Sequence, residues 1–166
     1  MGKAYLSLGS NVAPEHHLAS AVRALRQRFA ALQVSPVYRT TAIGFDGPDF
    51  LNAAAVLESD LDVHALNEWL HSLEDSHGRD RKEPRFGNRS LDIDIVFYDD
   101  LVAEGPGNLR IPRPELKHAF VLKPLVDIAP GFVDPLSGKT LQELWAQSLE
   151  RDVPMQVVEG VSGPAL

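Results

Sequence analysis

The sequence predicts an α+β fold in which helices cover one face of an antiparallel sheet. Two segments carry apolar residues at helical spacing, and four others show the alternation or the short apolar run of a strand. In chain order these segments read β-α-β-β-α-β. This order is typical of the ferredoxin-like split βαβ arrangement, which we expect here with an added C-terminal hairpin and helix.

The first half of the chain supplies three strands and one helix. Residues 4–8 form a short apolar strand, and Gly9 follows it. Pro14 suits the first turn of a helix, whose apolar residues recur at spacings of 4, 3, 4 and 3: Leu18, Val22, Leu25, Phe29 and Leu32. Residues 34–41 and 50–59 complete the set as the second and third strands.

The second half begins with another amphipathic helix. Asp62 can cap it, Gly78 can end it, and four apolar residues face the core: Val63, Leu66, Leu70 and Leu73. Residues 91–96 follow as the fourth strand, and residues 101–111 as a hairpin around a Gly-Pro-Gly turn. Several prolines then predict an extended C-terminal half, before a capping box at 140–143 opens the last helix.

Composition limits the class of protein. The chain of 166 residues suits a single domain, 1–166, with a core at about 4–149 and a frayed tail. Its net charge of −7 argues against a nucleic-acid partner, and the lack of cysteine excludes disulfides and thiolate metal sites. No apolar run suits a membrane span or a signal peptide, so we expect a cytoplasmic protein, and a monomer.

The stretch from 79 to 99 organises the functional prediction. Its first part is a basic loop containing Arg79, Arg81, Lys82, Arg85 and Arg89. Its second part is a strand on which Asp92 and Asp94 share one face, about 7 Å apart. Carboxylates at this spacing can hold one or two Mg²⁺ ions, and arginines can hold phosphate oxygens. The alternatives are a solvated Asp-x-Asp turn and a salt-bridged surface loop, but together the two features favour a metal–phosphate site.

Five motifs give the sequence a resemblance to a known family. They are YLSLGSN at 5–11, YRT at 38–40, PDFLNA at 48–53, RFGNRSLDID at 85–94 and AFVLKPL at 119–125. In this order they resemble the hydroxymethyl-dihydropterin pyrophosphokinases of folate biosynthesis. The resemblance implies a ferredoxin-like fold and transfer of the terminal diphosphate of ATP to the pterin hydroxymethyl group, with release of AMP. It also implies ATP and the dihydropterin as small-molecule substrates and two Mg²⁺ ions as cofactors.

The same resemblance assigns roles to individual residues. It makes Asp92 and Asp94 the metal ligands, and Asn52 the residue that reads the pterin edge. The other pterin contacts that it implies are Thr40, Ile43, Phe50, Asp92 and a stacking ring at Phe120. The ATP contacts that it implies are His71, Glu74, Arg81, Arg85, Arg89, Ile95 and Arg113, and the catalytic residues are Arg79, Arg89 and Asp94. From the residues alone, Asn52 could be a strand-end amide and Phe120 a core ring.

The sequence departs from the family pattern at several positions. Phe86 and Asn88 stand where the family commonly has Trp and Pro, and Arg113 stands where it has His. The family also carries a proline near positions 41–42, and the segment 112–120 is one residue short. Two further functions therefore stay open. One is a pterin-binding or regulatory relative with weakened catalysis. The other is a nucleotidyltransferase, because Gly9-Ser10 and Asp92-x-Asp94 are similar to elements of that class. In that class the two elements lie close together in sequence, whereas here about eighty residues separate them.

Overall fold

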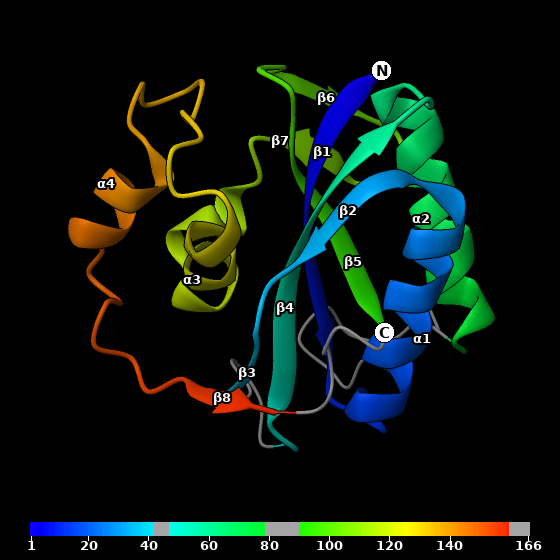
Figure 1. Ribbon diagram of the computed structural model, residues 1–166, viewed down its shortest axis with the longest axis horizontal. Helices are drawn as coiled ribbons and strands as arrows, with labels where there is room; N and C mark the ends of the chain where they lie inside the picture. Colours follow the sequence, from blue (N-terminus) through cyan, green and yellow to red (C-terminus); the bar gives the residue numbers. More distant parts are fainter. Residues whose placement is uncertain (42–46, 79–89, 160–166) are drawn as a thin grey trace.

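The structure is a computed structural model that describes residues 1–41, 47–78 and 90–159 (Figure 1). One large sheet runs through the middle of the molecule in the order β5-β1-β4-β3-β8, and β2 also pairs with β4. All of these pairings are antiparallel. Its strands are β1 (Gly2–Ser10), β2 (Ala30–Val34), β3 (Val37–Thr40), β4 (Phe50–Ser59), β5 (Asp92–Tyr98) and β8 (Gln156–Val158). The predicted α+β class and antiparallel sheet are confirmed.

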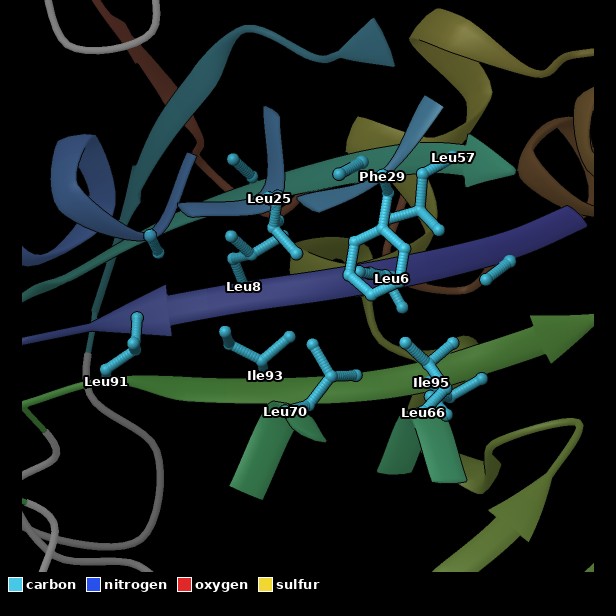
Figure 2. Packing of buried hydrophobic residues seen from close by; sticks show 14 of the residues in the cluster. Leu6, Leu8, Leu25, Phe29, Leu57, Leu66, Leu70, Leu91, Ile93 and Ile95 are labelled. Atoms are coloured by element: carbon cyan, nitrogen blue, oxygen red, sulfur yellow. The ribbon is translucent and has the colours of Figure 1, made fainter. Parts of the chain in front are cut away.

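Helices α1 (Pro14–Arg28) and α2 (Val63–Ser76) cover one face of this sheet. Leu6 and Leu8 of β1 and Ile93 and Ile95 of β5 point into the core beneath them (Figure 2). α2 begins as predicted, because the Asp62 side chain accepts a hydrogen bond from the backbone N–H of Ala65 at 2.8 Å. Alternation along the strands sends every second residue to this face and the residues between them to the opposite face.

The opposite face of the sheet is covered by α3 (Ala119–Ile128) and α4 (Leu141–Ala146). The two helices predicted for one face do cover it, but helices on the opposite face were not predicted. The prediction of an extended C-terminal half is wrong, because α3 lies within it. The prolines do not keep this part of the chain extended, because Pro114 opens the 3₁₀ turn Pro114–Lys117 and Pro124 lies inside α3. A proline inside a helix costs about 3 kcal/mol, but α3 buries most of its apolar side chains against the sheet.

The remaining predictions hold with shifted bounds. The strand predicted at 34–41 is shorter, because β3 spans Val37–Thr40 and Val34 is the last residue of the separate strand β2. The Ser35 hydroxyl there accepts a hydrogen bond from the Ala54 N–H at 2.8 Å. The predicted hairpin is β6 (Ala103–Gly105) with β7 (Leu109–Ile111), and the capping box at the start of α4 is present.

Strand β8 was not predicted, because its three residues follow a segment without periodicity. Throughout the ranges that the structure describes, no helix combines the length and apolar character needed to cross a membrane.

Candidate active site

The site is built on a row of three residues that crosses the middle of the sheet. Gly9 of β1 is paired with Asn52 of β4 on one side and with Asp92 of β5 on the other. Directly opposed residues of antiparallel strands point to the same face, so Asn52 and Asp92 face the same way, about 10 Å apart at the backbone. Gly9 places no side chain between them. A Cβ at Gly9 would lie 3.2 Å from Asn52 Oδ1, so a larger residue would press on that amide.

Three of the predicted pterin contacts surround one end of this row. The buried Asn52 donates from Nδ2 to Thr40 Oγ1 at 2.6 Å, and Thr40 is paired with Phe50 across β3 and β4. Alternation puts Thr40, Phe50 and Asn52 on the same sheet face. The hydrogen bond to Thr40 fixes the orientation of the amide and leaves its Oδ1 as an acceptor.

Asp92 and Asp94 occupy the other end of the row, on the same face of β5 as predicted, since Ile93 between them points into the opposite core. Nowhere in the described part of the chain do three His, Cys, Asp or Glu side chains gather into a metal-binding group. Mg²⁺ fits such a pair, because it is commonly held by one or two carboxylates together with water and substrate phosphates. Oxygen ligands alone also suit Mg²⁺ better than Zn²⁺.

Negative charge accumulates around Asp94. Burial, and after it the neighbouring Asp92 carboxylate, raise the pKa of Asp94 to about 8, and Arg113 opposes this shift. The Asp94 side chain nevertheless remains 32% exposed. Two neighbouring carboxylates are a favourable place for a cation, because a bound cation offsets their repulsion.

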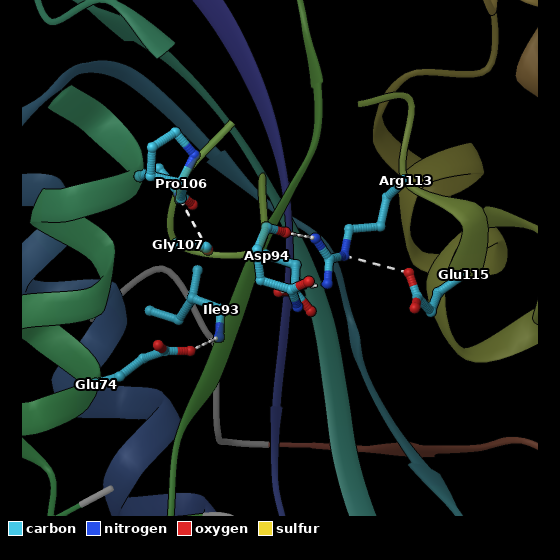
Figure 3. A network of polar contacts seen from close by, with 9 residues as sticks. Glu74, Ile93, Asp94, Pro106, Gly107, Arg113 and Glu115 are labelled. Carbon is cyan, nitrogen blue, oxygen red and sulfur yellow. Dashed lines mark hydrogen bonds and ion pairs between the residues drawn. The ribbon is translucent and has the colours of Figure 1, made fainter. Parts of the chain in front are cut away.

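Arg113 supplies a cation within reach of this group (Figure 3). Its Nη2 lies 3.5 Å from Asp94 Oδ1 and its Nε lies 3.2 Å from Glu115 Oε2, while Nη1 donates to the Asn108 carbonyl at 2.8 Å. The Arg113 side chain is only 10% exposed. The residue that departs most clearly from the family pattern therefore points inward, toward a predicted metal ligand.

Helix α2 approaches the same strand from the other side. Glu74, 1% exposed, accepts a hydrogen bond at Oε2 from the backbone N–H of Ile93 at 2.8 Å. This bond ties α2 to the outer edge of β5 between the two aspartates, which suits a residue that positions the strand (Figure 3). His71, one turn earlier on α2, lies beside Gly107 of the β6–β7 turn. The nucleotide contacts expected of Glu74 and His71 stay predictions.

The structure places the side chain of Ile95, a predicted ATP contact, in the hydrophobic core. Its side chain is 1% exposed and packs in the core under α1 and α2, opposite to the aspartate face. A side-chain contact to ATP is therefore not available at this position. Five predicted residues lie outside the described residues: Ile43, Arg79, Arg81, Arg85 and Arg89.

Phe120 lies in the first turn of α3, which packs against β3 and β4 on the same face as Asn52. Its ring stacks on His118, with centroids 5.3 Å apart and planes 12° apart. His118 Nδ1 in turn lies 2.8 Å from Glu150 Oε2. Sequence reasoning missed His118, Glu150 and the role of Gly9, although the pairing of Gly9 could have been found by aligning the alternation of β1, β4 and β5.

Comparison with known proteins identifies the family of this site. The family described as 7,8-dihydro-6-hydroxymethylpterin-pyrophosphokinase (HPPK) matches residues 5–130. The chain belongs to the HPPK family. It is accordingly a pyrophosphokinase, and the matched residues include the whole Asn52–Gly9–Asp92 row.

Individual HPPK relatives support the same assignment. The chain is 38% identical over 149 residues to the 2-amino-4-hydroxy-6-hydroxymethyldihydropteridine pyrophosphokinase of Synechocystis sp., covering 87% of this chain and 75% of that one. It is 35% identical to the protein of the same name from Pseudomonas aeruginosa, covering 87% of this chain and 90% of that one.

Solved structures agree at the level of the fold. The HPPK-DHPS triple mutant of Plasmodium falciparum superposes with a TM-score of 0.70 at 14% identity. That match covers 90% of this chain but 44% of the longer one, so this chain spans less than half of the structure that it resembles. At this identity the superposition shows the fold alone.

Proposed function

We propose that this HPPK-family chain transfers diphosphate from ATP to the hydroxymethyl group of 6-hydroxymethyl-7,8-dihydropterin in folate biosynthesis, and releases AMP. The observation that carries the proposal is the row of Asn52, Gly9 and Asp92. It puts an amide suited to a pterin edge and a carboxylate suited to Mg²⁺ on one face, and the residue between them, Gly9, has no side chain.

The pterin end of the row offers both recognition and stacking. The Asn52 amide combines a donor and an acceptor, which is what the amino-pyrimidinone edge of a pterin requires. Thr40 holds this amide in place at 2.6 Å, and Phe120 supplies an aromatic ring from α3. The hydroxymethyl group of a pterin bound in this way would extend toward Asp92, where the phosphates are needed.

The phosphate end combines carboxylates with a buried cation. When Mg²⁺ is bound by Asp92 and Asp94, it neutralises charge on the phosphate oxygens and orients the chain of phosphates. Arg113 is placed to bind an oxygen of the nucleotide phosphates from the side of Asp94. Transfer itself is a direct displacement, in which the pterin hydroxyl oxygen bonds to the β-phosphorus as the bond to AMP breaks.

The decisive measurement is product analysis with ATP, Mg²⁺ and hydroxymethyl-dihydropterin. We expect one AMP for each pterin diphosphate formed, and loss of most turnover in both Asp92→Ala and Asp94→Ala, with a smaller change in pterin affinity. Diphosphate released with a nucleotidyl product would favour a nucleotidyltransferase instead. Tight pterin binding without AMP would favour a regulatory relative.

A second measurement tests the pterin end. A buried pterin edge without its partner costs about 1–3 kcal/mol, so Asn52→Ala should weaken pterin binding by roughly five- to 150-fold and leave binding of an ATP analogue nearly unchanged. Gln33→Ala, at an exposed position of β2, is the control. A larger loss for the ATP analogue than for the pterin would remove Asn52 from the pterin site.

A further inference from the structure

A segment after α4, residues 147–158, connects two parts of the proposed pterin site, and we call it the C-terminal strap. It leaves α4, passes the first turn of α3 and ends in β8 against β3 (Figure 1). The match to the family model ends at residue 130, before the strap begins.

Glu150 of the strap holds the start of α3 with both of its carboxylate oxygens. Oε1 accepts a hydrogen bond from the backbone N–H of Ala119 at 3.0 Å, and Oε2 accepts from Nδ1 of His118 at 2.8 Å. Burial of Glu150 works against its charge, but these two hydrogen bonds still lower its pKa. A carboxylate at a helix N-terminus also interacts favourably with the helix dipole, so Glu150 fixes the direction in which α3 begins.

The fixed His118 ring then determines where the Phe120 ring can lie. The two rings stack nearly parallel, with 12° between their planes. Phe120 is only half-buried, so the core alone does not hold it on every side. The contacts run from Glu150 to His118 and from His118 to Phe120, with no intervening residue.

The far end of the strap holds the other side of the site. β8 extends the sheet by pairing Val158 with Val37 and Gln156 with Arg39 of β3. β3 carries Thr40, which orients the Asn52 amide. The Tyr38 hydroxyl of β3 also donates a hydrogen bond to the Asp127 carboxylate of α3. The strap therefore contacts α3, which supplies Phe120, and β3, which supplies Thr40.

We infer that Glu150 is a positioning residue for the pterin, acting through His118 to hold the Phe120 ring in its stacking orientation. This inference rests on the proposed function, because it assigns Phe120 to the pterin. A ring that is already fixed loses less conformational freedom when the ligand binds, so the benefit appears in pterin affinity.

The test measures the binding of each substrate separately in Glu150→Ala and Glu150→Gln. Calorimetry with hydroxymethyl-dihydropterin, in the presence of Mg²⁺ and a non-hydrolysable ATP analogue, should show a roughly three- to tenfold higher pterin Kd in Glu150→Ala. The Kd of the ATP analogue should stay within about twofold of its value in the unaltered protein. The hydrogen bonds of Glu150 go to the start of α3 and not to Asp92 or Asp94. Asp152→Ala, an exposed position of the same strap, is the matched control and should change neither Kd.

Glu150→Gln keeps one acceptor oxygen and turns a donor toward His118 or Ala119. It should raise the pterin Kd by about two- to threefold, and it decides the case where Glu150→Ala does not fold. A lower Tm with both Kd values unchanged would show a purely structural strap and overturn the inference, as would equal weakening of both substrates. Failure of the unaltered protein to bind the pterin would instead overturn the proposed function.

Discussion

Arg113 sits among carboxylates in a way that couples the metal and nucleotide parts of the site. Its guanidinium faces Asp94 and Glu115 and is almost completely buried. An arginine with three fixed partners has little freedom to turn away, and its planar group can contact a carboxylate and a phosphate together. The histidine that the family carries here would be neutral or charged according to pH, whereas Arg113 stays a cation.

Removing this cation should affect ATP rather than the pterin. We expect Arg113→Ala to raise the ATP KM by roughly tenfold or more, because a charge-assisted hydrogen bond is worth about 1.5–3 kcal/mol. The pterin Kd should stay nearly unchanged. Steady-state kinetics at low ionic strength, where screening is weakest, provide the measurement.

Arg110→Ala is the matched control for this variant, because Arg110 is exposed and pairs with the exposed Glu104 in the same hairpin. Its ATP KM should remain that of the unaltered protein. An ATP KM that does not change in Arg113→Ala would place Arg113 outside the nucleotide site and leave it as a structural partner of Asp94.

The residues that could be predicted are those whose neighbours follow from strand alternation. Asp92 and Asp94 share a face because they are two residues apart on a strand, and Asn52 and Thr40 followed from motifs on neighbouring strands. The hydrogen bonds of Glu74 and Glu150 to the backbone could not be found in this way. Their partners are backbone N–H groups 19 and 31 residues away in sequence, and only packing brings them together.

Among the elements, α3 shows why proline is an incomplete guide. The spacing of its apolar residues suited a helix, but Pro124 and its neighbouring prolines favoured an extended chain. Burial on a sheet face outweighed the cost of one proline. α2 was predicted more closely, because its apolar spacing and the Asp62 cap agree with each other. α1 begins at Pro14 as predicted but ends at Arg28, and Leu32, which was predicted to be helical, lies in β2.

Two histidines join α1 and α2 at the surface of the first layer. The Nδ1 atoms of His17 and His77 lie 2.6 Å apart, and the His77 Nε2 lies 3.3 Å from the Ser20 hydroxyl. Burial, and after it the charge of nearby histidines, lower the pKa of both residues below 6.5. A hydrogen bond between the two Nδ1 atoms requires that at least one ring be neutral.

This pair predicts a loss of stability on mild acidification. Between the lowered folded pKa values and 6.5 the unfolded chain binds more protons than the folded protein, so the free energy of unfolding falls as pH falls below about 6.5. Urea unfolding at a series of pH values should show this fall, and His77→Gln should reduce it. His64→Gln, at an exposed position of α2, should leave the profile intact; equal slopes in all three proteins would contradict the prediction.

At the scale of the whole molecule, one sheet serves two hydrophobic layers. β1 sends Leu6 and Leu8 to the α1–α2 layer and Tyr5 to the α3–α4 layer, and β4 and β5 divide their side chains in the same way. The first layer was predicted from helical periodicity, whereas in the second layer only α4 was predicted, from its capping box. The row of Asn52, Gly9 and Asp92 lies on the sheet face that α3 and α4 cover. The less well predicted layer is therefore the one beside the proposed site. A monomeric state stays a prediction.

Because both layers depend on the same strands, we expect them to unfold together. Leu66→Ala in the first layer and Leu125→Ala in the second each remove a fully buried leucine, and each should lower the free energy of unfolding by about 2–5 kcal/mol.

The two tryptophans report on the layers separately, since Trp69 packs on the first core and Trp145 on the second. In the single-tryptophan proteins Trp145→Phe and Trp69→Phe, fluorescence should give the same urea midpoint, and either leucine variant should shift both signals equally. A Leu125→Ala variant that moves the Trp145 signal and not the Trp69 signal would show that the α3–α4 layer detaches from a sheet that stays folded.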